Sequence, residues 1–286
     1  MSDRFAALSS FLKNYPAARI GMLLLLIAAP AGSFSQVFMR PFDPSNVQAL
    51  GSAAVAYPGN AAGLANDAAP GLGDKMAVFL GTTLPYGISG WHTAQFQALA
   101  GLGPNDGLGL EINYSAIETY TEQQYRLVYG RRLGARILLG GSIQALRVSA
   151  QEYGGSTALT FGLSMLAEPL PGVWLGARMQ NPLQLEMSGI PIPSVLRVGA
   201  AWKAASTLIL LSELEKDLDR PAQVKAGVEY RPVAALALRL GLRTEPARLG
   251  FGAGFQLKNG IELNSGAEWH PVLGFSPSAL LVWRRK

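Results

Sequence analysis

The segment 236–256, with the sequence LALRLGLRTEPARLGFGAGFQ, contains two runs in which apolar residues occupy every second position. In the first run, leucines from Leu236 to Leu242 alternate with alanine, arginine and glycine. Because successive side chains of a β-strand point to opposite faces, each run predicts a strand with one apolar face and one polar or glycine-rich face. Such segments are too polar to be buried parallel strands, which are apolar on both faces.

Runs of the same kind repeat from about Lys75 to the C-terminal end of the sequence. We count about fourteen, each close to the ~9–11 residues that a tilted strand needs to cross a bilayer. Their approximate spans are 75–84, 91–100, 107–117, 121–131, 135–149, 156–166, 173–180, 195–203, 206–214, 222–230, 234–243, 247–257, 261–269 and 277–284. An even number of strands is typical of bacterial outer-membrane barrels. We therefore predict an all-β fold, a transmembrane antiparallel β-barrel of about 14 strands over residues 75–286.

A soluble β-sandwich is the alternative to the barrel, since its strands also alternate. In a sandwich the polar face would meet water, but here that face is mostly glycine and has few lysines to protect sheet edges. The composition is also unusual for a soluble protein, with 49% hydrophobic residues, 15% charged residues and 33 glycines in 286 residues. Soluble domains carry about 25% charged residues. An apolar outer face in contact with lipid accounts for both features.

The net charge of +5 is concentrated at the two ends of the chain. The first 35 residues carry an excess of two positive charges, Arg284, Arg285 and Lys286 carry three more, and the rest is neutral. The basic stripe that nucleic-acid binding requires is therefore missing, and we expect no nucleic-acid partner. The absence of cysteine excludes disulfides, thiolate metal sites and cysteine nucleophiles.

Residues 1–35 have the pattern of a signal peptide that is cleaved during export. Lys13 and Arg19 precede the apolar stretch 21–29, and Ser33 and Ser35 form a small-x-small cleavage site. The alternative is a single membrane anchor, but the apolar stretch is much shorter than the ~20 residues that span a bilayer. We expect the mature chain to begin at Gln36 and to reside in the cell outer membrane.

Residues 36–74 lack alternation and are rich in alanine, glycine, proline and asparagine. Because small residues pack closely, we interpret this segment as an N-terminal plug inside the lumen, with a flexible arm as the alternative. Its candidate functional residues are Asn60, Asn66 and Asp67. Glycines on the inward face of the predicted strands would leave room for a plug or a ligand: Gly162, Gly176, Gly199, Gly227, Gly241, Gly250, Gly252 and Gly266.

Charged residues share this predicted luminal face with the glycines. Opposite charges there can pair with each other and with backbone groups of the plug. They either seal and rigidify the barrel or mark a substrate path. The candidates are Glu111, Arg126, Arg136, Arg178, Arg197, Glu229, Arg239, Arg243, Glu262 and Glu268.

The predicted connections and aromatic residues suggest an orientation. Outer-membrane barrels have short periplasmic turns and longer outer loops, and here the even-to-odd connections are the short ones. Aromatic residues collect at membrane interfaces. Trp91 and Trp269 would mark the outer interface, and the periplasmic interface would hold Tyr129, Trp202, Tyr230 and Trp283.

The connection 181–194 is unusually apolar for an outer loop. An exposed apolar patch can mark a partner or ligand site. A loop that folds over its own barrel mouth explains the composition equally well. The residues concerned are Leu183, Leu185, Met187, Ile190 and Ile192.

The sequence lacks the signatures of catalysis. His92 and His270 are its only histidines, so a histidine-rich metal site cannot be built. The nucleophile elbow and the phosphate-loop lysine motif are both missing, and the glycines of 250–254 lie inside an alternating strand. We expect no catalytic residue, no metal and no cofactor, although a lipid-modifying activity of either histidine is a testable alternative.

Several short stretches resemble the PorV/PorQ-like proteins of Bacteroidota, relatives of the long-chain fatty-acid transporter barrels. They are ALGSA (49–53), NAAGL (60–64) or NDAA (66–69), YGRRLG (129–134), LGLRTEP (240–246) and EWHPVLG (268–274). Neither plug stretch contains the proline of the family's Asn-Pro-Ala-Gly-Leu-like motif.

This resemblance implies a fourteen-stranded barrel with a luminal plug. For function, it implies a component or substrate shuttle of type IX protein secretion, or alternatively a transporter for hydrophobic compounds such as long-chain fatty acids. The expected partners are outer-membrane lipid and lipopolysaccharide, with a secretion translocon or exported proteins in the first case.

Overall fold

The computed structural model describes residues 37–38, 42–73 and 76–285. All of them belong to one compact unit, 36–286. The predicted signal peptide, residues 1–35, lies outside the described residues. Within the described part of the chain, no helix has both the length and the apolar character needed to cross a bilayer.

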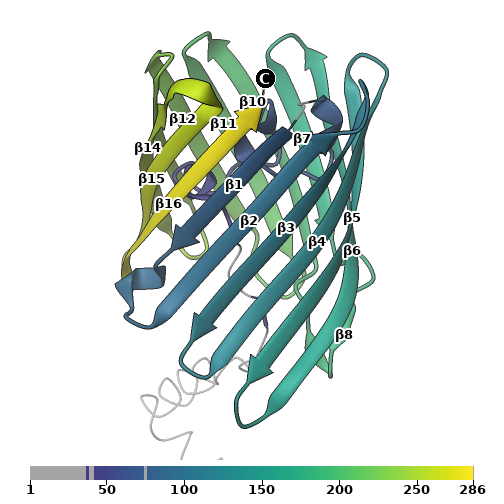
Figure 1. Cartoon of the computed structure of the whole chain (residues 1–286), viewed down its shortest axis with the longest axis vertical. Coiled ribbons are helices and arrows are strands. Elements are labelled where there is room, and N and C mark those ends of the chain that lie inside the picture. The colour runs from purple at the N-terminus through teal and green to yellow at the C-terminus, as the bar shows by residue number, and fades with distance from the viewer. Residues whose placement is uncertain (1–36, 39–41, 74–75, 286) are drawn as a thin grey trace, which may run out of the picture. The chain divides into compact units, whose positions relative to one another are not determined.

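Fourteen strands of the described part close into one barrel (Figure 1). Every neighbouring pair is antiparallel, and β1 closes the ring by pairing with β16. The strands are β1 (Met76–Thr83), β2 (Trp91–Gly101), β3 (Asp106–Ile117), β4 (Tyr120–Leu133), β5 (Ile137–Ala150), β6 (Gly154–Leu170), β7 (Val173–Gln180), β10 (Val195–Ala205), β11 (Leu208–Asp217), β12 (Gln223–Val233), β13 (Leu236–Arg243), β14 (Arg248–Gln256), β15 (Ile261–His270) and β16 (Gly274–Arg285). The predicted antiparallel barrel of about 14 strands is confirmed.

The barrel has its apolar residues on the outside and its charges within. On β13, Leu240 and Leu242 are 54% and 50% exposed, whereas Arg239 and Arg243 are 4% and 7% exposed. A soluble protein buries its leucines, so this inverted pattern rejects the sandwich and fits a sheet that faces hydrocarbon.

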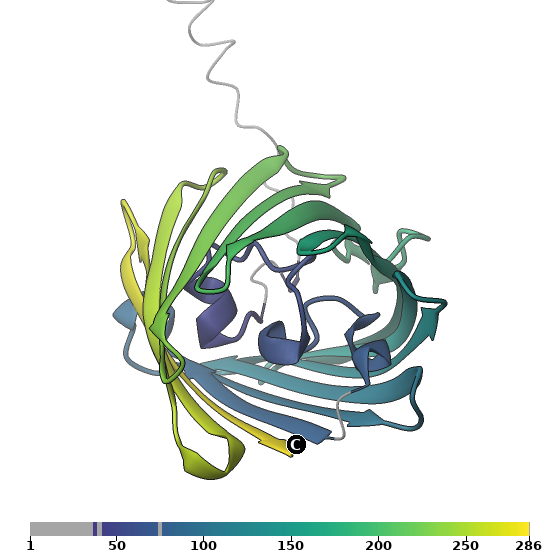
Figure 2. The ribbon, with the colours of Figure 1, turned by 90° about the horizontal axis from the view of Figure 1, so that it is seen from above.

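Residues 42–73, called the luminal segment below, run through the inside of the ring (Figure 2). They form the short helix α3 (Ser45–Gln48) and the 3₁₀ turns η1 (Asn60–Ala62) and η2 (Ala69–Leu72). Two further 3₁₀ turns, η3 (Pro85–Gly87) and η4 (Lys258–Gly260), lie in connections between strands. Val47, Leu50 and Val55 are buried against Ala201 and Leu211 of the wall. The largest apolar cluster of the described residues therefore lies between the luminal segment and the barrel.

Inward-facing glycines make this packing possible. A Cβ atom at Gly227 would lie 2.7 Å from the carbonyl oxygen of Leu50, and one at Gly252 would lie 2.9 Å from Ala49 Cβ. All eight glycines predicted to face inward have an atom of the luminal segment within 3.2 Å of such a Cβ position. Because interiors are close-packed, side chains at these positions would push the luminal segment away from the wall.

The barrel has two distinguishable ends. β1 begins and β16 finishes at the terminal end, while the connection 181–194 lies at the opposite, loop end. This connection contains a small hairpin of β8 (Glu186–Met187) and β9 (Ile190–Pro191).

The expectation of longer connections at the loop end is only partly correct. The connection 181–194 is long, but residues 118–119 and 271–273 form tight turns. Some strands pair further toward the loop end than the sequence indicated; β6, for example, begins at Gly154 and β16 at Gly274. Alternation of apolar residues marks a strand only where one face meets an apolar environment, so it fails for polar strand ends.

The aromatic residues predicted at the membrane interfaces do not all face outward. Tyr129, Trp202 and Tyr230 are 40–54% exposed, on strands where apolar residues point outward. Trp91, however, points into the barrel and donates from Nε1 to Ser115 Oγ at 3.0 Å. Its expected place at the outer membrane interface is wrong, because Trp91 shares its face of β2 with the inward Gln95 and Gln97.

Candidate functional site

A cavity of about 660 Å³ opens inside the barrel toward the loop end and is called the vestibule below. Its floor includes Leu64 and Ala65 of the luminal segment. Ile117 and Leu273, which lie at or beyond strand ends, border its mouth. A solute that enters from the loop end therefore meets the luminal segment.

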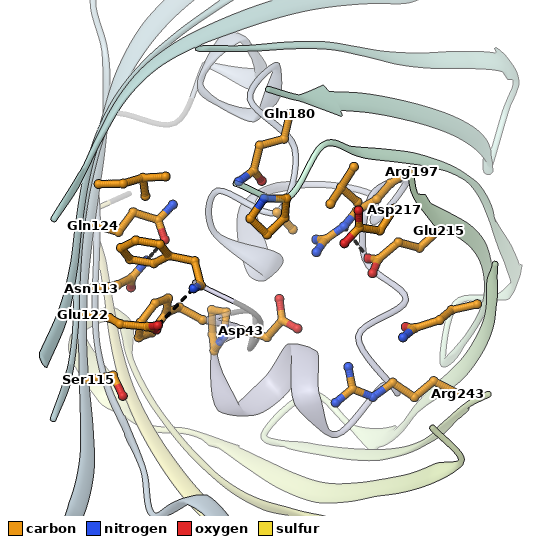
Figure 3. Close-up of a pocket in the computed structure, with 18 of the residues that line it drawn as sticks. Asp43, Asn113, Ser115, Glu122, Gln124, Gln180, Arg197, Glu215, Asp217 and Arg243 are labelled. Carbon is orange, nitrogen blue, oxygen red and sulfur yellow. Dashed lines mark hydrogen bonds and ion pairs between the residues drawn. The ribbon is translucent and has the colours of Figure 1, made fainter. Parts of the chain in front are cut away.

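The vestibule has two chemically different walls (Figure 3). One wall, formed by β3 and β4, carries amide, hydroxyl and carboxylate groups, with Asn113 donating to Gln124 at 3.3 Å. The opposite wall carries Arg197, which pairs with Glu215, together with Asp217 and Arg243 (Figure 3). Asp43 of the luminal segment lies between them (Figure 3).

Apolar side chains share the vestibule with these polar groups. Phe38, Phe42, Leu64, Leu146 and Val195 all line it. Pockets that combine apolar surface with a few polar groups typically bind organic molecules and orient them. The vestibule can thus accommodate a compact molecule that has an apolar body and a hydrogen-bonding end.

On one side, the luminal segment is held through its own carboxylate, Asp67, in what we call the arginine anchor. Asp67 Oδ1 lies 2.5 Å from Arg126 Nη1 and 3.4 Å from Arg178 Nε, and Asp67 Oδ2 accepts a hydrogen bond of 2.8 Å from Ser142. Arg126 also pairs with Glu111 and donates to the Leu64 carbonyl at 2.9 Å. Burial opposes ionisation of Asp67, but Arg178 and Arg126 together hold its pKa below the ordinary value.

On the other side, carboxylates of the wall hold the luminal segment, in what we call the glutamate anchor. Glu213 Oε2 accepts the backbone N–H groups of Ala54 at 3.0 Å and Val55 at 2.9 Å. Lys225 lies 2.9 Å from Glu213 and balances its charge. Tyr57 donates to Glu229 at 2.8 Å. Burial, with Glu229 close by, raises the pKa of Tyr57, so its hydroxyl stays protonated as a donor.

The remaining predicted luminal charges pair within the wall, with one exception. Arg239 joins Glu229 to Glu262 at 2.7 and 3.4 Å, and Arg243 lies 2.7 Å from Glu268. Arg136 lies instead in the exposed turn between β4 and β5 and donates to the Pro169 carbonyl at 2.8 Å. The sequence interpretation extended the strand by two residues across this turn and so gave Arg136 a luminal position that it does not have.

The predicted plug residues differ in what the structure shows of them. Asn66 donates to the carbonyl oxygens of Val55 at 2.8 Å and Met165 at 3.0 Å, which ties the luminal segment to itself and to β6. Asn60 begins η1, and its side chain lies outside the described part.

Glu213 is the wall carboxylate of the two anchors that the sequence interpretation missed. It lies on the same face of β11 as Leu211, Glu215 and Asp217. The succession of acidic residues at alternate positions was the available signal. The predicted strand, 206–214, ended too early for that signal to be used.

The apolar connection 181–194 folds largely over its own barrel mouth. Met187 and Ile192 are buried against Val37 and Leu146. Ile190 packs beside them, and Asn181 holds the base of the connection through the Ile192 carbonyl at 3.1 Å. Leu183 and Leu185 remain exposed. Of the five predicted contact residues, only these two present an open surface.

The described residues contain no group of three histidine, cysteine or acidic side chains that could hold a metal ion. His270 lies at the rim of the vestibule, where its Nδ1 accepts backbone N–H groups of Val272 and Leu273 at 3.1 and 3.2 Å. His92 lies on the exposed face of β2.

No protein-family model and no curated protein sequence matches the chain. Solved structures match its fold. The Pseudomonas putida toluene transporter TodX aligns with a TM-score of 0.64 and 12% identity, over 87% of this chain and 98% of the other. The chain has the fold of a bacterial outer-membrane channel. The CymD monoaromatic hydrocarbon channel (TM-score 0.64, 11% identity, 85% and 97% coverage) and a Pseudomonas aeruginosa FadL homologue (0.63, 10%, 86% and 97%) align similarly.

Proposed function

We propose that the protein is a normally closed outer-membrane channel that takes up small, partly apolar organic molecules through the vestibule. The observation that carries this proposal is the vestibule itself, which opens at the loop end and is floored by the luminal segment. Passage to the terminal end then requires the luminal segment to shift.

The packing of the luminal segment supports a closure that can be released. Its backbone rests on glycines, and polar groups hold it at the arginine and glutamate anchors. Water that enters from the vestibule can solvate the groups freed when the segment shifts, which offsets part of the loss, since a hydrogen bond to a charged group contributes about 1.5–3 kcal/mol net. The displaced segment would leave a lumen lined by glycine and polar side chains, with apolar side chains such as Leu211 and Val128 among them.

The fold and the lining together favour uptake of organic molecules. Among the proteins of similar fold are a toluene transporter and a monoaromatic hydrocarbon channel. The aromatic rings of Phe38, Phe42 and Trp91 in the vestibule suit a ring-containing solute. The amide side chains of the wall formed by β3 and β4 suit a hydroxyl group. We infer that neutral compounds such as benzyl alcohol fall within the substrate range.

Uptake by cells that carry the protein in an outer membrane depleted of other channels tests this proposal. We expect the wild type to accelerate the initial uptake of labelled benzyl alcohol over cells without the protein. Ala65→Trp, which fills the floor of the vestibule, should abolish the gain, whereas Ala267→Trp on β15 should retain it because Ala267 follows the outward register of that strand. Wild-type uptake equal to that of cells without the protein would contradict the proposal.

A role in type IX secretion, and membership of the PorV/PorQ-like group, remain predictions from the sequence resemblance. Such a role needs a surface for an exported protein or a translocon, and in the connection 181–194 only Leu183 and Leu185 offer one. Affinity purification from solubilised membranes distinguishes the two functions. A stoichiometric protein partner lost in a Leu183→Ser/Leu185→Ser variant would favour secretion, and recovery of the barrel alone would favour uptake.

A further inference from the structure

Two arginines lie opposite each other beside the vestibule. Arg178 on β7 and Arg197 on β10 are register partners, and like charges in this arrangement repel. Arg197 is balanced within the wall, with its Nε 2.7 Å from Glu215. Within the described residues, Arg178 has one carboxylate within 4.0 Å, and this is Asp67 at 3.4 Å. The nearest balancing charge for Arg178 therefore comes from the luminal segment rather than from the wall.

Asp67 is shared between two arginines that depend on it to different degrees. Arg126 would keep its pairing with Glu111 if Asp67 moved away. Arg178 is only 7% exposed, and without Asp67 it would have no carboxylate within ion-pair distance among the described residues. An uncompensated buried charge is strongly unfavourable. Displacement of the luminal segment is therefore easier when another anion takes the place of Asp67.

Unsatisfied donors lie in the same part of the wall. Among the described residues, Arg178 Nε and Gln144 Nε2 are buried without a hydrogen-bond acceptor. Both residues line the vestibule, and Gln144 is the register partner of Arg126. Guanidinium and amide N–H groups are complementary to carboxylate oxygens. The wall therefore offers more donors than Asp67 satisfies.

We propose that Arg126 and Arg178 form a carboxylate site which Asp67 occupies in the closed protein, and that an anionic solute entering the vestibule exchanges with Asp67. Arg126 and Arg178 both line the vestibule, so such a solute reaches them from the loop end while Asp67 holds them from the luminal segment. Phe42, Leu64 and Leu146 line the same cavity and provide surface for an apolar body. The site thus favours a compact monocarboxylate over its neutral analogue.

Binding of benzoate to the purified full-length protein in detergent tests the exchange, with benzamide as the uncharged match. Asp67→Asn removes the internal competitor, so we expect it to bind benzoate at least about tenfold more tightly than the wild type, a difference of about 1.4 kcal/mol. Benzamide affinity should not change. A heat-dependent gel shift verifies that each variant is folded. Equal benzoate affinity in the two folded proteins would overturn the proposal.

A second pair of variants tests the arginine. Arg178→Gln leaves the pair of Asp67 and Arg126 intact and is expected to fold. In an Asp67→Asn background, Arg178→Gln should lose the gain in benzoate affinity, whereas Arg147→Gln, at an exposed position on β5, should keep it. Retention of the gain in both double variants would place the benzoate elsewhere and overturn the proposal.

A third measurement follows the luminal segment directly. Because the chain lacks cysteine, Ala62→Cys introduces a single thiol at a buried position of the luminal segment. Benzoate should accelerate its reaction with N-ethylmaleimide, and benzamide should not. A labelling rate that benzoate leaves unchanged would contradict the exchange.

The inference rests on the proposed uptake function, but the two fail separately. Loss of benzoate binding would leave the uptake of benzyl alcohol intact. If the protein does not take up benzyl alcohol, the benzoate affinities of the variants still test the exchange.

Discussion

The two anchors hold the luminal segment with opposite polarity. At the arginine anchor, the luminal segment supplies the carboxylate, Asp67, and the wall supplies the donors. At the glutamate anchor, the wall supplies the carboxylates, and the luminal segment supplies backbone N–H groups and the Tyr57 hydroxyl. Only the first contact can be imitated by a small anion from the vestibule. The arginine anchor is therefore the one that a solute can release, whereas the glutamate anchor retains the segment.

The largest energetic difference between the anchors is expected for Asp67→Asn. This change leaves Arg178 without a carboxylate partner and should lower the local stability of the luminal segment by about 3–5 kcal/mol, the cost of breaking a buried ion pair. Hydrogen exchange of the amides around residue 67 measures the loss. Unchanged protection in the folded variant would show that Arg178 is balanced in another way.

Glu213→Gln should have a smaller effect, and one confined to the glutamate anchor. The neutral amide still accepts hydrogen bonds, but those from Ala54 and Val55 lose their charge assistance, which corresponds to about 1–2 kcal/mol. Faster exchange at these two amides, without tighter benzoate binding, is the expected result. Glu186→Gln in the exposed hairpin is the control and should change neither quantity. If Glu213→Gln tightens benzoate binding, the proposed division of roles is wrong.

Tyr57→Phe should have the smallest effect, about 1 kcal/mol for one hydrogen bond. Glu229 keeps Arg231 and Arg239 at 2.7 Å, so its charge stays balanced after the change. Thermal unfolding in detergent measures this loss against Tyr153→Phe, whose ring is exposed. A loss as large as that of Asp67→Asn would remove the energetic distinction between the anchors.

The barrel could be predicted from sequence because alternation is a local signal. In the segment 236–256, apolar side chains follow the outward register and arginines follow the inward register, as β13 shows. The same alternation also identifies the inward glycines. Strand ends were less accurate where the outer face is polar, as at Gly154.

The anchors could not be predicted because their partners are far apart in the sequence. Asp67 meets Arg126 and Ser142 across 59 and 75 residues, and Glu213 meets Ala54 across 159. Alternation shows that Arg126 faces inward, but it does not show which part of the luminal segment lies opposite. The course of that segment has no periodic pattern, so only its packing against the glycines reveals it.

Single-channel conductance in a planar bilayer tests most directly whether the luminal segment closes the barrel. A Cβ at Gly140 would collide with the backbone of Asp67 and Ala68, and one at Gly241 with that of Leu50, whereas one at Gly141 has no neighbour closer than 3.7 Å. We predict that the wild type and Gly141→Val are nearly silent and that Gly140→Val and Gly241→Val conduct. Conductance of the wild type equal to that of the two luminal variants, or silence of all four folded proteins, would contradict closure by the luminal segment.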